Sequence, residues 1–161
     1  MATQRYLGSP NAVVLCIQKI DKSEIEPELK GEMFHSYQEK GIAFDNLEQM
    51  INHMEQFFDR LGFPQRSTNS RSFFPQTLVQ HHSQEEKVMK DEQVLSKHGE
   101  LGTFIVRVQH RQNSSWQGRL TWVEEDKTIN FRSIWEMIKL IENAVDTVSE
   151  PEDEESQGWD L

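Results

Sequence analysis

The sequence predicts an α+β protein of two tandem β-β-β-α repeats, paired as a pseudo-two-fold pseudodimer and followed by a disordered acidic C-terminal tail. Three observations predict this fold class. Two segments of the chain align with each other without a gap, each ends in a periodic amphipathic helix, and the last residues carry only acidic charge. The expected organisation is a first repeat over residues 1–66, a polar linker over 67–100, a second repeat over 101–147 and the tail over 148–161.

The internal alignment sets residues 31–59 against residues 118–146. Self-similarity of this kind is the sequence signature of a repeated structural unit. The identical pairs are Gly31/Gly118, Lys40/Lys127, Ile42/Ile129, Phe44/Phe131, Met50/Met137, Ile51/Ile138, Glu55/Glu142 and Asp59/Asp146. Because one unit of about 45 residues has too small a core to be stable alone, we expect the two units to bury their apolar faces together.

Each copy begins with a segment rich in β-branched residues, at 12–20 and at 103–111, which predicts a strand. A second strand is expected to begin near the shared glycine. Turns at 38–41 and 124–127 then lead to short third strands at 42–44 and 128–131.

Apolar residues at helical spacing predict a helix at the end of each copy. In the first copy they are Leu47, Met50, Ile51, Met54, Phe57, Phe58 and Leu61. In the second they are Ile134, Met137, Ile138, Ile141, Ala144 and Val145. Asn46 with Gln49, and Ser133 with Glu136, have the spacing of a capping box. The first helix is expected to end at residues 61–64, and the second near Asp146.

The linker is polar and rich in turn formers at its start. Its segment 71–78, with Phe73 and Phe74, is a candidate extra edge strand or anchor. Residues 84–99 predict a weak, mostly exposed helix that ends at Gly99.

Composition limits the possible functions. The chain has no apolar run of about 18 residues and no signal-peptide pattern, so we expect a cytoplasmic protein without a membrane span. Its one cysteine, Cys16, lies in an apolar run and is interpreted as a buried structural thiol. No metal-ligand spacing, nucleophile elbow or phosphate-binding glycine loop is present, so neither catalysis nor a cofactor is expected.

Charge divides the chain unevenly. The tail holds six acids and no lysine or arginine, and without these six the net charge of −10 becomes −4 for residues 1–147. Such a segment buries too little to fold by itself. It either keeps the protein soluble or docks on a basic surface, with Trp159 and Leu161 as the apolar anchors of a tail motif.

The second copy carries the candidate binding residues. On an extended strand Arg107 and Arg111 share one face, and Arg119 of the next strand would join them. No acid occurs between Leu101 and Val123. The partner-binding candidates are Arg107, Arg111, Asn113, Trp116, Arg119 and Trp135. Trp135 stands at the position of Glu48 in the first copy, either packing between the units or exposed as an anchor.

Two resemblances follow from these residues. The segment 113–118, "NSSWQG", resembles the (D/N)xSxxG loop of PilZ domains, and Arg107 with Arg111 resembles their RxxxR element. This implies binding of cyclic di-GMP, although here only Gln112 separates two elements that lie far apart in PilZ domains. The pattern Ser115–Gly118, Trp122, Phe131–Ser133, Glu136 and Leu140–Ile141 is similar to that of small uncharacterised bacterial proteins, a resemblance that implies no activity.

The sequence therefore predicts a non-catalytic, cytosolic interaction or regulatory protein. Its partner, expected to be a protein, would bind through a sheet face and a groove between the repeats. One alternative is an acidic nucleic-acid mimic that inhibits a DNA- or RNA-binding enzyme, as anti-CRISPR proteins do. Another is a module that binds an anionic nucleotide such as a cyclic dinucleotide. Neither membrane contact nor direct DNA binding is expected.

Overall fold

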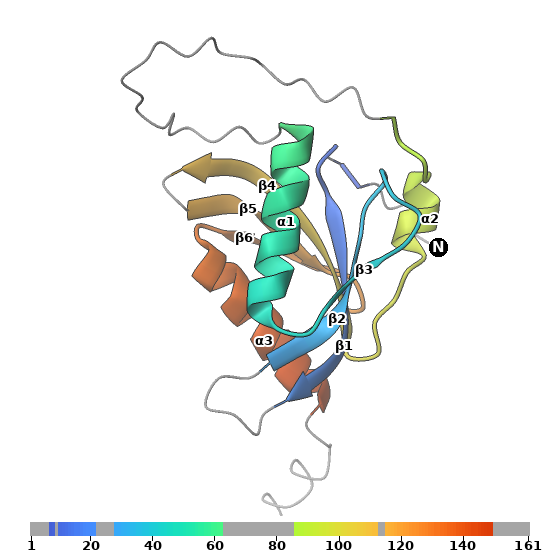
Figure 1. The fold of residues 1–161 in the computed structure, drawn as a ribbon. Helices are drawn as coiled ribbons and strands as arrows, with labels where there is room; N and C mark the ends of the chain where they lie inside the picture. The colour runs from blue at the N-terminus through green and yellow to red at the C-terminus, as the bar shows by residue number, and fades with distance from the viewer. Residues whose placement is uncertain (1–6, 9, 22–27, 63–85, 113–114, 150–161) are drawn as a thin grey trace, which may run out of the picture.

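The computed structural model describes residues 7–8, 10–21, 28–62, 86–112 and 115–149 (Figure 1). Six strands and three helices lie within these ranges. In chain order they are β1 (Val13–Asp21), β2 (Glu28–Phe34), β3 (Ile42–Phe44), α1 (Leu47–Leu61), α2 (Asp91–Leu95), β4 (Gly102–Gln112), β5 (Ser115–Trp122), β6 (Lys127–Phe131) and α3 (Ile134–Ser149). The protein is thus an α+β protein, and each half has three strands followed by a long helix.

All six strands form one antiparallel sheet in the order β3-β2-β1-β4-β5-β6. The first strands of the two halves join the sheet at its centre, where Val13 pairs with Val106 and Ile17 pairs with Gly102. Sequence patterns could not decide whether the two halves would share a sheet. The structure shows that they do.

The shared glycines stand at matching places in the two halves. Gly31 pairs with Phe44, and Gly118 pairs with Phe131. A Cβ on Gly31 would collide with the backbone carbonyl of Cys16, and one on Gly118 with that of Arg107. Each glycine also lies opposite a bulge in the central strand of its half, at Ile17/Lys19 and at Val108/His110. Close backbone approach, rather than the expected strand entry, therefore requires these glycines.

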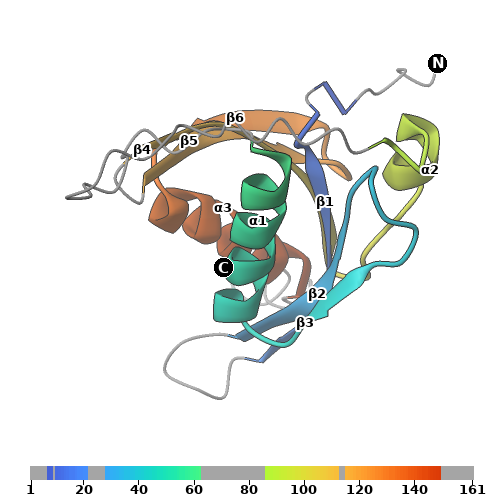
Figure 2. The same cartoon turned by 45° about the horizontal axis from the view of Figure 1, so that its top comes forward.

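The two long helices lie on one side of the sheet, which curves around them (Figure 2). Their apolar stripes join one core with the facing strand residues, among them Met54, Phe58 and Ile141. Both predicted caps are present, because Asn46 Oδ1 accepts from Gln49 N and Ser133 Oγ accepts from Glu136 N. The helix α3 continues to Ser149, beyond the end near Asp146 that the sequence predicted.

The opposite face of the sheet holds a smaller core. Leu7 and Ala12 of the N-terminal segment pack there with Val14, Cys16 and Ile105. Met89 and Val94 close this cluster, both buried. The prediction of a mostly exposed helix near residues 84–99 is therefore wrong in part. The helix is only Asp91–Leu95, and its apolar side packs on the sheet.

Some predictions fall outside the described residues, among them the edge strand at 71–78 with Phe73 and Phe74. The tail falls there too from residue 150 onward, while Val148 and Ser149 belong to α3. Among the described helices, none is both long and apolar enough to cross a membrane.

Candidate functional site

Two of the three candidate arginines share the sheet face opposite the long helices. Arg107 of β4 and Arg119 of β5 are direct cross-strand neighbours. Arg107 donates to the Leu7 carbonyl over 2.6 Å and to Thr121 Oγ1 over 3.0 Å. Burial, and then the nearby positive charge of Arg119, lower the pKa of Arg107. Arg119 itself is exposed, so this pair presents positive charge to solvent.

Arg111 does not join them, and the prediction that all three share a face is wrong. The bulge between Val108 and His110 adds one residue to β4, which reverses the alternation of side chains after it. Arg111 therefore turns to the helix side, where only 5% of it is exposed. Its Nη1 lies 3.0 Å from Asp59 Oδ1 of α1, and its guanidinium lies over the Phe58 ring.

Trp116 is also buried, with 1% of its surface exposed, which leaves no area for the partner contact expected of it. Its indole N–H donates to Glu55 over 3.2 Å, and its ring meets Phe58 edge-on at 5.4 Å. Trp116 and Arg111 thus connect strands β5 and β4 of the second half to helix α1 of the first half. Their role in the structure is to hold the two halves together.

Trp135 is the candidate that remains exposed, at 65%. The ammonium of Lys139 lies over its ring, 4.5 Å from the centroid. Trp135, Lys139, Asn143 and Thr147 are spaced four residues apart, so they form one exposed ridge along α3. Of the two interpretations made from the sequence, packing between the units or exposure, the structure shows exposure. Asn113, Trp159 and Leu161 lie outside the described residues.

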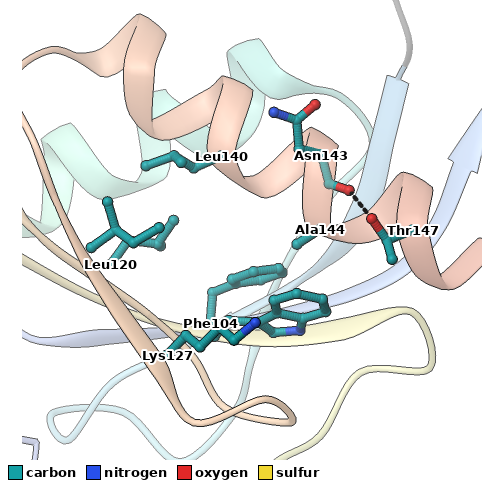
Figure 3. A pocket seen from close by; sticks show the side chains of 9 residues that line it. Phe104, Leu120, Lys127, Leu140, Asn143, Ala144 and Thr147 are labelled. Atoms are coloured by element: carbon teal, nitrogen blue, oxygen red, sulfur yellow. Dashed lines mark hydrogen bonds between the residues drawn. The ribbon is translucent and has the colours of Figure 1, made fainter.

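At one end of this ridge lies a cavity of about 260 Å³ between α3 and the strands β4, β5 and β6. We call it the β6–α3 groove. Figure 3 shows Leu140, Asn143, Ala144 and Thr147 of α3 on one side and Phe104, Leu120 and Lys127 of the sheet on the other. The residues that line it are Phe104, Leu120, Trp122, Lys127, Ile129, Leu140, Asn143, Ala144 and Thr147.

The groove is mainly apolar, with few polar groups. Phe104 and Trp122 stack in its wall with ring centroids 6.4 Å apart. The indole N–H of Trp122 is buried and meets no hydrogen-bond acceptor in the described part of the chain. A buried donor without an acceptor costs about 1–3 kcal/mol and marks a place whose hydrogen bonding is incomplete. Lys127 supplies the one charged side chain of the lining.

The groove exists because of a difference between the halves. In the alignment of Gly31 with Gly118, Ala144 stands opposite Phe57 and Trp122 opposite His35. In the first half the Phe57 ring stacks on His35 at 4.0 Å and is buried. In the second half Ala144 has only a methyl group at the corresponding place, and the space beside Trp122 stays open.

The strand beside the groove is at the edge of the sheet. The strand order puts β6 last, and within the described residues no strand pairs with its outer side. Its first four residues are exposed, and Ile129, which lines the groove, is 49% exposed. An exposed edge strand offers backbone N–H and C=O groups to another strand.

No family model, no curated protein and no solved structure matches this chain.

The remaining candidates for chemistry are the Cys16 thiol and clusters of metal-ligating side chains. Burial raises the pKa of the Cys16 thiol to about 12, with smaller contributions from Glu32 and Glu124, so the thiol is protonated at neutral pH. This agrees with its interpretation as structural. Over the residues that the structure describes, no group of three or more His, Cys, Asp or Glu side chains is placed to hold a metal ion.

The groove was not among the sites predicted from the sequence, although one signal was available. The replacement of an aromatic by alanine at matched core positions, Phe57 and Ala144, indicates missing volume in one half. Taken alone, the sequence could not show whether neighbouring side chains refill that volume.

Proposed function

We propose that this protein is a non-catalytic interaction protein that binds an extended segment of a protein partner in the β6–α3 groove. The segment adds as a further strand beside β6 and places one apolar side chain in the cavity. The observation that carries this proposal is the position of an open, apolar cavity directly beside β6, whose outer side pairs with no other strand among the described residues. Strand addition of this kind derives affinity from main-chain hydrogen bonds and specificity from side-chain pockets.

The size of the cavity supports a side chain as the ligand. Pockets that enclose a drug-sized molecule usually measure about 300–1,000 Å³, and this one measures about 260 Å³. A cyclic dinucleotide needs more space than this. One large apolar side chain, with its backbone held by β6, is a better match.

The two sides of β6 suggest a pattern for the bound segment. Alternate side chains of an added strand point to opposite faces of the sheet. On one face they meet the groove, and on the other they meet Asn130 and the face that carries Arg107 and Arg119. We therefore propose a segment that alternates between apolar and acidic residues.

We also propose that the chain is an internal duplication and that it acts in the cytoplasm. Matching strand registers and matching glycine contacts in the two halves support a duplicated chain that folds as a fused pseudodimer. The expected groove between the repeats is replaced in this proposal by a groove inside the second half. A cytoplasmic location and the absence of catalysis remain part of the proposal.

A displayed library of random peptides, selected on the full-length chain, tests the function. We expect selected peptides to alternate in polarity and to bind with micromolar Kd. Binding should perturb the amide signals of Thr128, Ile129 and Asn130 in NMR spectra. Peptides that bind without perturbing β6 would contradict the proposal.

Two controls distinguish the contribution of the cavity to peptide binding from that of backbone hydrogen bonds to β6. Ala144→Phe fills the cavity and should weaken binding at least tenfold without unfolding the chain. N-methylation of alternate amides of a selected peptide should abolish binding in one register and leave it intact in the other, because only alternate N–H groups face the neighbouring strand. Equal losses in both registers would argue against an added strand.

A second candidate function rests on the other face. The strands β4, β5 and β6 contain no Asp or Glu, and Arg107 and Arg119 lie side by side there. Like charges directly opposite each other in a sheet are destabilising, and an anionic ligand would offset this cost. Titration with cyclic di-GMP, with Arg119→Gln as the control, tests an anionic-nucleotide site. An acidic nucleic-acid mimic would have to act through other parts of the chain, because these strands are basic.

A further inference from the structure

The geometry points to a specific occupant of the β6–α3 groove. We propose that residues 150–161 of the same chain dock there, with the Trp159 side chain in the cavity. The protein would thereby regulate its own binding site. This inference rests on the proposed function and adds to it the identity of a competing segment.

Residues 150–161 directly follow the helix that lines the groove. The helix α3 runs to Ser149, and both Asn143 and Thr147 in its last turns line the groove. Residues 150–161 therefore start beside the groove. Fully extended, they can span about 40 Å, since each residue covers at most about 3.3–3.6 Å. The five residues of β6 span about 17 Å, so the segment is long enough to turn back and run along this strand.

The residue pattern of the segment also matches the groove. Its end, "WDL", places Trp159 and Leu161 on one face of an extended strand and Asp160 on the other. This is the alternation that the two sides of β6 favour. Trp159 would meet Phe104, Leu140 and the other apolar groove residues, while Asp160 would face the side of Asn130 and Arg119.

The charge of the segment is opposite to that of the strands beside the groove. The segment contains six acids and neither lysine nor arginine. The three strands nearest to the groove contain no acid, and they carry Arg107, Arg119 and Lys127. Their remaining arginine, Arg111, is buried and paired with Asp59. Of the nine residues that line the groove none is acidic. The exposed turn at Glu124–Asp126 is acidic and adjoins Lys127, so the acids of the segment are expected to lie nearer the Asn130 end of β6.

The experiment compares full-length chains that differ only in this segment. Trp159→Ala should remove the anchor, and Glu152→Gln is the matched control, because it removes one negative charge and keeps the apolar pattern. We expect Trp159→Ala to shift the NMR signals of the Trp122 indole N–H and of the Ile129 amide. Glu152→Gln should leave both signals in place. Identical spectra for the unmodified chain and Trp159→Ala would overturn the inference.

A synthetic peptide of residues 150–161 provides the reverse test. Added to the Trp159→Ala chain, it should restore the original Trp122 and Ile129 signals saturably. A scrambled peptide of the same composition should not. If both peptides act equally, charge alone drives the contact and the docking is overturned. If signals of Arg107 and Arg119 move while those of the groove do not, the segment docks on the opposite face and the inference is wrong.

Competition separates this inference from the proposed function. A tethered segment competes at an effective concentration of about millimolar. If its own affinity is about 0.1 mM, Trp159→Ala should raise the affinity of a library peptide about tenfold. If library peptides bind in the groove with equal affinity to both chains, self-docking fails and the proposed function stands. If no peptide binds either chain, the proposed function fails as well. Dependence of the Trp122 shift on protein concentration would assign the segment to a second copy and overturn docking within one chain.

Discussion

The two halves of this molecule have the same order of elements but use their matched positions differently. In the first half Phe57 stacks on His35 and fills the space between helix and sheet. In the second half Ala144 leaves that space open beside Trp122, and the β6–α3 groove results. The first half thus has buried side chains at the place where the second half has a cavity. One difference in side-chain size, phenylalanine against alanine, is thus enough to separate a filled position from an open one in two halves of the same element order.

A second difference concerns how the halves are joined. Near the end of β4 the second half contributes Arg111, and near the start of β5 it contributes Trp116. Both contact α1 of the first half through Asp59, Glu55 and Phe58. At the corresponding positions of the first half stand Ile20 and Leu29, which are apolar. The contacts of Arg111 and Trp116 with α1 thus include polar ones, whereas Leu29 belongs to the shared apolar core and Ile20 packs against it.

The largest expected effect comes from making the first half resemble the second. Phe57→Ala should open a cavity against His35 and lower the free energy of unfolding by about 3–5 kcal/mol, as large-to-small substitutions of buried aromatics do. Urea denaturation followed by circular dichroism measures this. A loss below about 1 kcal/mol would show that the first half refills the space, and the comparison between the halves would then fail.

The next prediction tests the ion pair between Arg111 of the second half and Asp59 of the first half. Asp59→Asn removes the partner carboxylate of the buried Arg111, while Asp59 itself is half exposed. We expect a loss of about 1–2 kcal/mol, because a buried guanidinium loses an ionic hydrogen bond but solvent screens part of it. Glu39→Gln, in an exposed turn, is the control and should change the stability by less than about 0.5 kcal/mol. Equal effects of the two substitutions would show that the ion pair between Arg111 and Asp59 does not stabilise the packing of the two halves.

Cys16 in β1 stands at the position that Arg107 occupies in β4, and its thiol is expected to make the free energy of unfolding depend on pH. Burial raises the pKa of Cys16 from its ordinary value of 9.0 to about 12 in the folded protein. Between these values the unfolded chain loses the thiol proton while the folded chain keeps it, so the stability falls as the pH rises from about 9 to about 12. Below pH 9 the thiol causes no pH dependence.

The measurement is the slope of the unfolding free energy against pH, compared between the unmodified chain and Cys16→Ala. Lysines and tyrosines contribute to both slopes and cancel in the difference. We expect a shallower decline for Cys16→Ala above pH 9. Parallel curves would show that the folded protein admits the thiolate.

The smallest change in stability is expected for the substitution that makes the second half resemble the first. Ala144→Phe puts a ring into an open space beside Trp122, so the unfolding free energy should change by less than about 1 kcal/mol. Its effect on peptide binding should be large, with affinity at least tenfold weaker. Calorimetric titration with a selected peptide measures the binding. Unchanged affinity would place the partner site outside the groove.

The candidate site was predictable only in part. Arg119 and Trp135 are exposed, as binding residues need to be, whereas Arg111 and Trp116 are buried. Strict alternation along β4 failed because the bulge at Val108/His110 reverses the faces after it. The bulge lies opposite Gly118, where the backbones of β4 and β5 approach closely, and such a contact between strands is a tertiary feature. For the same reason the arginine pattern indicated three residues on one face where the structure has two.

The sequence by itself determined the order of strands and helices, the caps at Asn46 and Ser133, and the apolar stripes of α1 and α3. These features depend on neighbours in the chain, so local spacing is enough to specify them. Only the tertiary structure decided that β1 pairs with β4, that Arg111 points to α1, and that the space at Ala144 stays open. Each of these depends on which distant residues meet, and packing between distant segments decides that.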